Sequence, residues 1–258
     1  MWLSFKMQRR KRLMARPLKT EWLALMERNV LYYRLLSPEM QGELRGLVQV
    51  FLDEKTFEGC GGVEITDEIR VTIAAYACIL LLGRRTDIYP KLRSILVYPK
   101  SYVAPLLRQE PDGTVTEGLQ PRLGESWSRG NVVISWDDVL RRDRGASRNV
   151  VLHEFAHQLD SESGSDEGAP LLPDPSMYAD WARVLGKEYQ ELIHAAEQGR
   201  PTLLDPYGAT SPAEFFAVAT ECFFETPIEM ETLHPELYGQ LSLFYRQDPA
   251  SLRRQVQQ

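Results

Sequence analysis

Two histidines four residues apart are the residues of this chain best suited to chemistry. They lie in the segment His153-Glu154-Phe155-Ala156-His157. In a helix, residues i and i+4 share one face, so both imidazoles can bind one zinc ion from the same side. Glu154 follows His153 by about 100° around the helix and lies beside such an ion without binding it. A carboxylate placed there can act as the general base of a metal-dependent hydrolase.

The alternative is that both histidines are structural. The chain has only four histidines in 258 residues, so a chance match to this pattern is rare. The segment 148–152 before the motif, together with Phe155, Ala156 and Leu159, predicts a buried helix. We therefore favour a metal site, and the structural pair stays the competing interpretation.

A zinc ion held by two histidines needs at least one further protein ligand. An extended HExxHxxGxxH motif is absent, because Asp160 and Ser163 occupy the positions of its glycine and third histidine. The leading candidate is Glu214, which precedes an apolar run in a predicted helix. A buried acid needs a positive partner. The alternative for Glu214 is a capping box, in which its carboxylate binds the amide of Ser211.

Two further acids are candidates for supporting roles. Glu221 lies two turns after Glu214 on the same face, and is either an alternative ligand or an acceptor for the N–H of a ligand imidazole. Asp160 lies about one turn beyond His157 and is a second candidate acceptor. Its alternative is an ordinary residue of the loop that follows the helix.

Composition limits the class of protein. A chain of 258 residues with 43% apolar content can form one large domain. The net charge of −6 argues against direct binding of nucleic acid. The three cysteines form no CxxC pair, which fits a reducing cytoplasm and argues against a disulfide framework. The longest apolar stretch, 71–82, is too short to span a membrane, so we expect a soluble cytoplasmic protein without a membrane partner.

The pattern of the chain predicts an α+β fold that is mainly helical with a small mixed sheet. We expect residues 1–20, which carry seven basic side chains and no acid, to be a flexible tail. The alternative is a contact arm for an acidic partner or a membrane surface. Residues 21–258 are expected to form a single domain.

The expected secondary structure is mainly helical. We expect helices over 21–53 (broken at 37–38), 66–83, 178–198, 211–224 and 234–245, and strands at 94–98 and 131–136. A glycine-rich turn is expected at 56–63 and a loop at 161–175. The 131–136 strand is either an edge strand able to pair with a peptide or a core strand.

Two separated segments together resemble a known family. They are 153–160, which contains the histidine pair, and 205–218, which reads Asp-Pro-Tyr-Gly-Ala-Thr-Ser-Pro-Ala-Glu-Phe-Phe-Ala-Val. With 95–99, 124–136 and 244–249, they resemble the MtfA family of bacterial zinc metallopeptidases. The resemblance covers roughly residues 25–250 and excludes the basic first 20. This two-part motif is far more specific than HExxH alone.

The resemblance implies a zincin fold of the gluzincin type, related to the catalytic domain of anthrax lethal factor, with an HExxH helix. His153, His157 and Glu214 match the family's ligands for one zinc ion, and Glu154 matches its catalytic glutamate. Tyr207 matches the tyrosine thought to stabilise the oxyanion in the lethal-factor relatives. The family is described as having aminopeptidase activity, and as binding a sugar-responsive transcriptional repressor, Mlc.

Two functions of different classes therefore compete. The first is a zinc-dependent, aminopeptidase-like enzyme that acts on a peptide or protein substrate. The second is a regulatory protein that captures a transcriptional repressor, with little proteolysis of its own. Glu154 and Tyr207 favour the first, because a purely structural zinc site needs neither. The flexible composition of the 161–175 loop, directly after the metal helix, suggests that it covers the site and keeps the enzyme latent.

Overall fold

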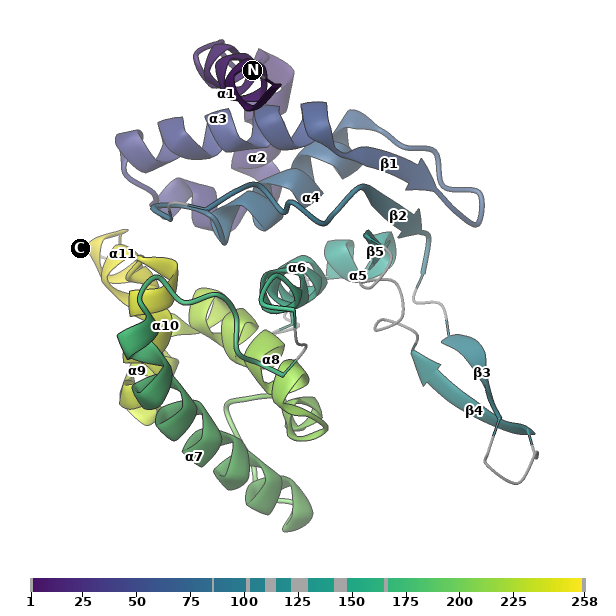
Figure 1. The fold of residues 1–258 in the computed structure, drawn as a ribbon, viewed down its shortest axis with the longest axis vertical. Coiled ribbons are helices and arrows are strands. Elements are labelled where there is room, and N and C mark those ends of the chain that lie inside the picture. Colours follow the sequence, from purple (N-terminus) through teal and green to yellow (C-terminus); the bar gives the residue numbers. More distant parts are fainter. Residues whose placement is uncertain are drawn as a thin grey trace.

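The computed structural model describes residues 2–84, 86–100, 103–109, 115–121, 130–141, 148–164 and 167–256. Residues 124–129 of the resembling segment 124–136, and 165–166 of the predicted loop, lie outside this part of the chain. Within it the fold is mainly helical (Figure 1). The described helices are α1 (Trp2–Met14), α2 (Thr20–Asn29), α3 (Pro38–Glu54), α4 (Asp67–Ile79), α5 (Trp136–Arg141), α6 (Val150–Ser161), α7 (Tyr178–Glu197), α8 (Pro212–Glu225), α9 (Pro227–Leu233), α10 (Pro235–Tyr245) and α11 (Pro249–Val256), with 3-10 turns η1 (Leu31–Leu35), η4 (Pro175–Met177) and η5 (Pro206–Ala209).

The described strands form a small parallel sheet and a separate hairpin. The sheet has the order β1 (Thr56–Gly59), β2 (Ser94–Tyr98), β5 (Asn131–Ser135). The hairpin consists of the antiparallel strands β3 (Val103–Gln109) and β4 (Val115–Pro121), and Figure 1 shows it extending away from the helices. Among the described residues β5 pairs only with β2, so the 131–136 segment supplies an edge strand. The α+β fold class with a small sheet is thereby confirmed, but the expected mixed sheet is wrong, because the three-stranded sheet is parallel and the antiparallel pair stands apart from it.

Helix boundaries follow from caps that the sequence contains. Ser37 accepts a hydrogen bond from the amide of Met40 at 3.3 Å, so the predicted break at 37–38 starts α3. Thr66 likewise accepts from the amide of Ile69 at 3.3 Å at the start of α4. The predicted 66–83 helix ends as regular α-helix at Ile79. No helix in the described part of the chain has the length and apolar character needed to cross a membrane.

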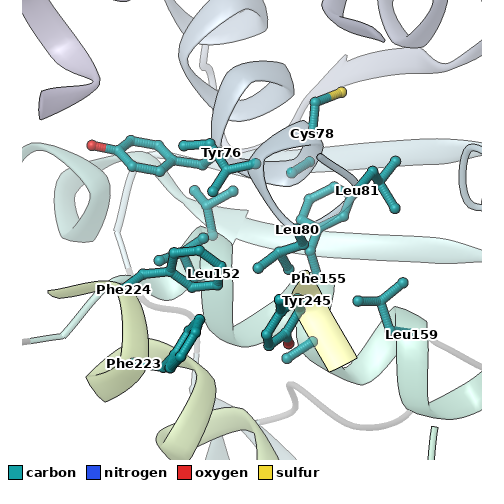
Figure 2. Close-up of a cluster of buried hydrophobic side chains, with 14 of the residues drawn as sticks. Tyr76, Cys78, Leu80, Leu81, Leu152, Phe155, Leu159, Phe223, Phe224 and Tyr245 are labelled. Carbon is teal, nitrogen blue, oxygen red and sulfur yellow. The ribbon is translucent and has the colours of Figure 1, made fainter. Parts of the chain in front are cut away.

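Helix α6 lies at the centre of the fold, between α4 on one side and α8 on the other (Figure 1). One of its faces is apolar. Phe155 packs against Tyr89 and Phe51 with ring centroids 4.9 and 5.7 Å apart. Figure 2 shows Leu152, Phe155 and Leu159 of α6 within a cluster of buried side chains contributed by α4, the residues after it, α8 and α10. This packing fixes the helix that carries both histidines.

Two segments differ from the sequence-based expectation. Residues 2–14 form a helix that packs on α3, where a flexible tail was expected. The guanidinium group of Arg10 donates two hydrogen bonds of 2.6 Å to Glu54 and also pairs with Asp87. Part of the basic charge is therefore neutralised within the molecule. In addition, the predicted glycine-rich turn at 56–63 begins with strand β1, because its backbone pairs with β2.

The first prediction concerns the apolar face of α6. Replacing Phe155 with alanine removes a fully buried ring, so the free energy of unfolding should fall by about 3–5 kcal/mol in denaturant titrations. Leu233→Ala is the control, because that side chain is 62% exposed and should change stability by less than about 0.5 kcal/mol. Equal stability of Phe155→Ala and wild type would contradict this account of the core.

Candidate metal centre

Two capped helices bring the site together. Asn149 caps α6, because its side-chain oxygen accepts a hydrogen bond from the amide of Leu152 at 3.1 Å. Ser211 caps α8 in the same way and accepts from the amide of Glu214 at 3.2 Å. The side chain of Glu214 does not close a capping box, since its carboxylate faces the two imidazoles of α6. The first turn of each helix is thus fixed beside the other helix.

Three donor atoms from these helices converge. Nε2 of His153 lies 3.2 Å from Nε2 of His157. An oxygen of Glu214 lies 3.0 Å from the first of these nitrogens and 3.4 Å from the second. Both imidazole side chains are 1% exposed and that of Glu214 is 16% exposed. In the described part of the chain, this trio is the group of acids, histidines and cysteines whose geometry could hold a metal ion.

The dimensions of this triangle fit zinc. Tetrahedral zinc with ligands at about 2.0–2.2 Å separates its donor atoms by about 3.3–3.6 Å. The observed separations of 3.0, 3.2 and 3.4 Å need only a small expansion to reach those values. Two imidazoles and one carboxylate are also a donor set that zinc binds in hydrolases, where three protein ligands leave the fourth position open.

Glu221 orients one of the imidazoles and is not among the three converging donors. One of its carboxylate oxygens accepts a hydrogen bond from Nδ1 of His153 at 2.7 Å. The other accepts from the amide of Asn149, the cap of the same helix, at 2.6 Å. A carboxylate on Nδ1 fixes the ring and leaves Nε2 to bind a metal. The structure thus places Glu221 where an acceptor for a ligand imidazole was expected.

The charges at the site favour a cation between the donors. Burial alone lowers the pKa of His153, but hydrogen bonds to Glu214 and Glu221 outweigh it and raise that pKa to about 10. Burial raises the pKa of Glu214, but hydrogen bonds from His153 and His157 outweigh it and lower that pKa to about 2. Without a metal, a proton on His153 therefore supplies the positive charge that the carboxylates require.

Glu154 and Tyr207 lie beside the donor triangle. Glu154 is fully buried, and its charge contributes to raising the pKa of both His153 and Tyr207. The ring of Tyr207 lies 6.2 Å from that of His153, between centroids. The pKa of Tyr207 is raised to about 12, mainly by burial and next by the negative charge of Glu214. The phenol therefore keeps its proton at neutral pH and can donate it in a hydrogen bond.

Sequence reasoning missed Arg148, and it placed Asp160 only loosely. The guanidinium group of Arg148 lies 5.1 Å from the ring centroid of Tyr207. No pattern in the sequence pairs these two residues. Asp160 is buried within α6, and it accepts a hydrogen bond of 2.7 Å from the amide of Gly168 in the loop that follows the helix. The cap at Asn149 was detectable, because Asn directly precedes the apolar residues of α6.

Comparison with known proteins identifies relatives of the whole chain. The family model described as "Glucose-regulated metallo-peptidase M90" matches residues 5–246. An uncharacterized protein of Synechocystis sp. is 41% identical over 254 residues, which cover 96% of this chain and 90% of that protein. Mlc titration factor A of Klebsiella pneumoniae is 31% identical over 224 residues, covering 85% and 84% of the two chains. Mlc titration factor A of Pectobacterium atrosepticum is 31% identical over 217 residues, covering 83% and 82%.

These matches test the resemblance inferred from the two-part motif. The family expected from the sequence is confirmed. The match begins at residue 5, so much of the N-terminal segment that we had left outside the resemblance falls within it. A metallopeptidase family implies a metal ion, which agrees with the convergence of the three donors.

The second prediction concerns pH. The pKa of His153 lies above its ordinary value of 6.5, at about 10, so a metal ion that binds between these pH values must displace a proton. Zinc affinity, measured by competition with a chelator, should therefore rise with pH between about 6.5 and 9. By the same linkage, the proton on His153 stabilises the metal-free protein below about pH 6.5, and this stabilisation is lost as pH rises through about 10.

Glu221→Gln is the control for this prediction. Removing that charge lowers the pKa of His153, so both pH dependences should weaken in the variant. The variant also distinguishes the effect of His153 on stability from that of Lys55. Burial lowers the pKa of Lys55 to about 8, so its contribution to stability rises with pH, opposite to that of His153. Zinc affinity that is independent of pH in the wild type would contradict the assignment.

Proposed function

The chain belongs to the family of M90 metallo-peptidases, and we propose that it hydrolyses peptide bonds with one zinc ion held by His153, His157 and Glu214. The observation that carries this proposal is the convergence of three donor atoms beside a fully buried Glu154. By resemblance to its family, we propose aminopeptidase-like activity on peptides. The cytoplasm is the proposed site of action, because a reducing compartment suits the free thiols of the three cysteines.

The proposed mechanism assigns Glu154 as the general base. A zinc ion in this site would lower the pKa of a bound water to about 7 and polarise the peptide carbonyl. Glu154 lies next to His153 on α6, where its carboxylate can accept the proton of the attacking water. It then delivers that proton to the amine that leaves. Burial of the carboxylate keeps bulk water from competing for the proton.

Tyr207 is assigned to the oxyanion. Its pKa of about 12 keeps the hydroxyl protonated, so the phenol can donate a hydrogen bond to the negative charge that develops on the carbonyl oxygen. One such donor is typically worth about 2.7–4 kcal/mol in the transition state. Arg148 lies over the ring and lowers the pKa of the phenol, which strengthens it as a donor. Among the described residues β5 is an edge strand, and we propose that an extended peptide substrate pairs with it.

The second candidate function is capture of a transcriptional repressor. Two relatives carry the name Mlc titration factor A, which associates those proteins with a partner called Mlc. We propose that this chain binds a repressor of that kind on its surface, with peptidase activity as a separate property. Binding of this type does not require Glu154, so one substitution separates the two functions.

The third prediction tests the enzyme. Glu154→Ala should retain about one zinc per chain in elemental analysis, because the three donors remain, while peptide hydrolysis falls by about 10²–10⁴-fold. Glu191→Ala is the control, since that acid is exposed on α7 and its loss should leave the rate unchanged. Hydrolysis by Glu154→Ala at the wild-type rate would end the proposed mechanism.

The fourth prediction tests repressor capture. A purified repressor of the Mlc type should bind wild type and Glu154→Ala with equal affinity in calorimetry, and neither protein should cleave it. Cleavage of the repressor by wild type but not by Glu154→Ala would make the repressor a substrate of the same site. Absence of binding to both proteins would remove this second function.

A further inference from the structure

Gly168 lies against residues of three different helices, α6, α7 and α8. Its amide donates a hydrogen bond of 2.7 Å to the carboxylate of Asp160, at the end of α6. Its carbonyl accepts a hydrogen bond of 3.1 Å from the indole nitrogen of Trp181 in α7. Its Cα faces the carbonyl of Pro212, the first residue of α8. We call these four residues the Gly168 clamp.

Three of the four clamp residues are buried, whereas Pro212 is exposed. Asp160 is 0% exposed, Trp181 is 2% exposed, and Gly168 is buried. Gly168 has a φ of +72°, and a Cβ built on it would lie 2.4 Å from the oxygen of Pro212. Only glycine fits this position, for reasons of backbone conformation and of space. The residue therefore sets how closely the loop after α6 approaches the start of α8.

The position of the clamp in the chain connects it to metal binding. Asp160 lies three residues after His157 on α6, and Pro212 lies two residues before Glu214 on α8. The clamp thus bridges the helix that carries both imidazoles and the first turn that carries the carboxylate. Metal ligands must hold their distances to within about 0.2 Å, so a small displacement of one helix against the other matters.

We propose that the Gly168 clamp is a positioning device that sets the place of Glu214 relative to the two imidazoles. This inference rests on the proposed function, since it takes Glu214 as the third ligand. A methyl group at 2.4 Å from the Pro212 carbonyl would have to move by about 1 Å to reach ordinary contact. Because Pro212 starts the helix and Ser211 caps it, that movement passes directly to Glu214.

The experiment compares Gly168→Ala with Gly164→Ala. Both glycines lie in the same loop with positive φ, at +72° and +94°, so both variants introduce backbone strain. Among the described residues, a Cβ on Gly164 meets no atom within 4 Å, whereas a Cβ on Gly168 meets Pro212. Comparing the two variants therefore separates the effect of backbone strain at a positive φ from the effect of a steric clash with the first residue of α8. Thermal unfolding of both metal-free variants checks that they are folded at the temperature of the binding measurement.

Two measurements are made on each variant. Zinc affinity, by chelator competition, should fall by about 10–100-fold in Gly168→Ala and remain near wild type in Gly164→Ala. The visible spectrum of the cobalt-substituted protein reports the coordination sphere. In Gly168→Ala it should change in the direction of the Glu214→Ala spectrum and not of the His157→Ala spectrum. A purely structural role for Gly168 would lower stability without this spectral change.

Trp181→Phe serves as a second variant if Gly168→Ala does not fold. It removes the hydrogen bond to the Gly168 carbonyl while keeping an aromatic ring, and should move the cobalt spectrum in the same direction by a smaller amount. If Gly168→Ala folds and shows the cobalt spectrum and zinc affinity of wild type, the inference is overturned. If Gly168→Ala does not fold, the same result in Trp181→Phe overturns it. Failure of the proposed function is distinct, because wild type itself would then bind neither zinc nor cobalt.

Discussion

The structure depends on how negative charge is balanced between α6 and α8. Glu154, Glu214 and Glu221 gather around two buried imidazoles, and carboxylates withdrawn from water are costly unless a positive charge accompanies them. Without a metal, the hydrogen bonds to Glu214 and Glu221 raise the pKa of His153, so a proton on this imidazole can meet this need. A divalent cation meets it better, because it supplies two charges at the point where the three donor atoms already converge. A metal ion that binds between these donors would therefore stabilise the folded state.

This arrangement explains why α6 carries two chemically different faces. Leu152, Phe155 and Leu159 pack into the aromatic core (Figure 2). His153 and His157 face α8, where both imidazoles lie close to the carboxylate of Glu214. The packing of the apolar face fixes the position of α6. The cap at Asn149 fixes its first turn, and the carboxylate of Glu221 fixes the imidazole of His153. A site of this kind stays preorganised, because its supporting contacts are buried and independent of the metal.

The sequence predicted those parts of the fold and the candidate site that follow from local rules. Spacing placed His153 and His157 on one face, and the apolar first turn after Ser211 singled out Glu214 as a buried acid. Contacts between segments far apart in the chain could not be predicted from the sequence. Helix α1 was not foreseen because its basic residues are neutralised by acids more than 40 residues away, and Gly168 could be judged only once Pro212 was known to lie beside it. The capping-box alternative for Glu214 was half right, since Ser211 does cap the helix.

The choice between an enzyme and a binding protein can be argued from the donor count and from Glu154. Structural zinc sites are closed by four protein ligands, whereas catalytic sites keep one position for water or substrate. Among the described residues three donors converge here. A fully buried glutamate next to them adds to the cost of burying charge and would bring no benefit to a site that only held the fold together. Groups that are costly for stability and suited to proton transfer are characteristic of active sites. The geometry therefore supports the proposed hydrolysis over a zinc ion that serves only to hold the fold together.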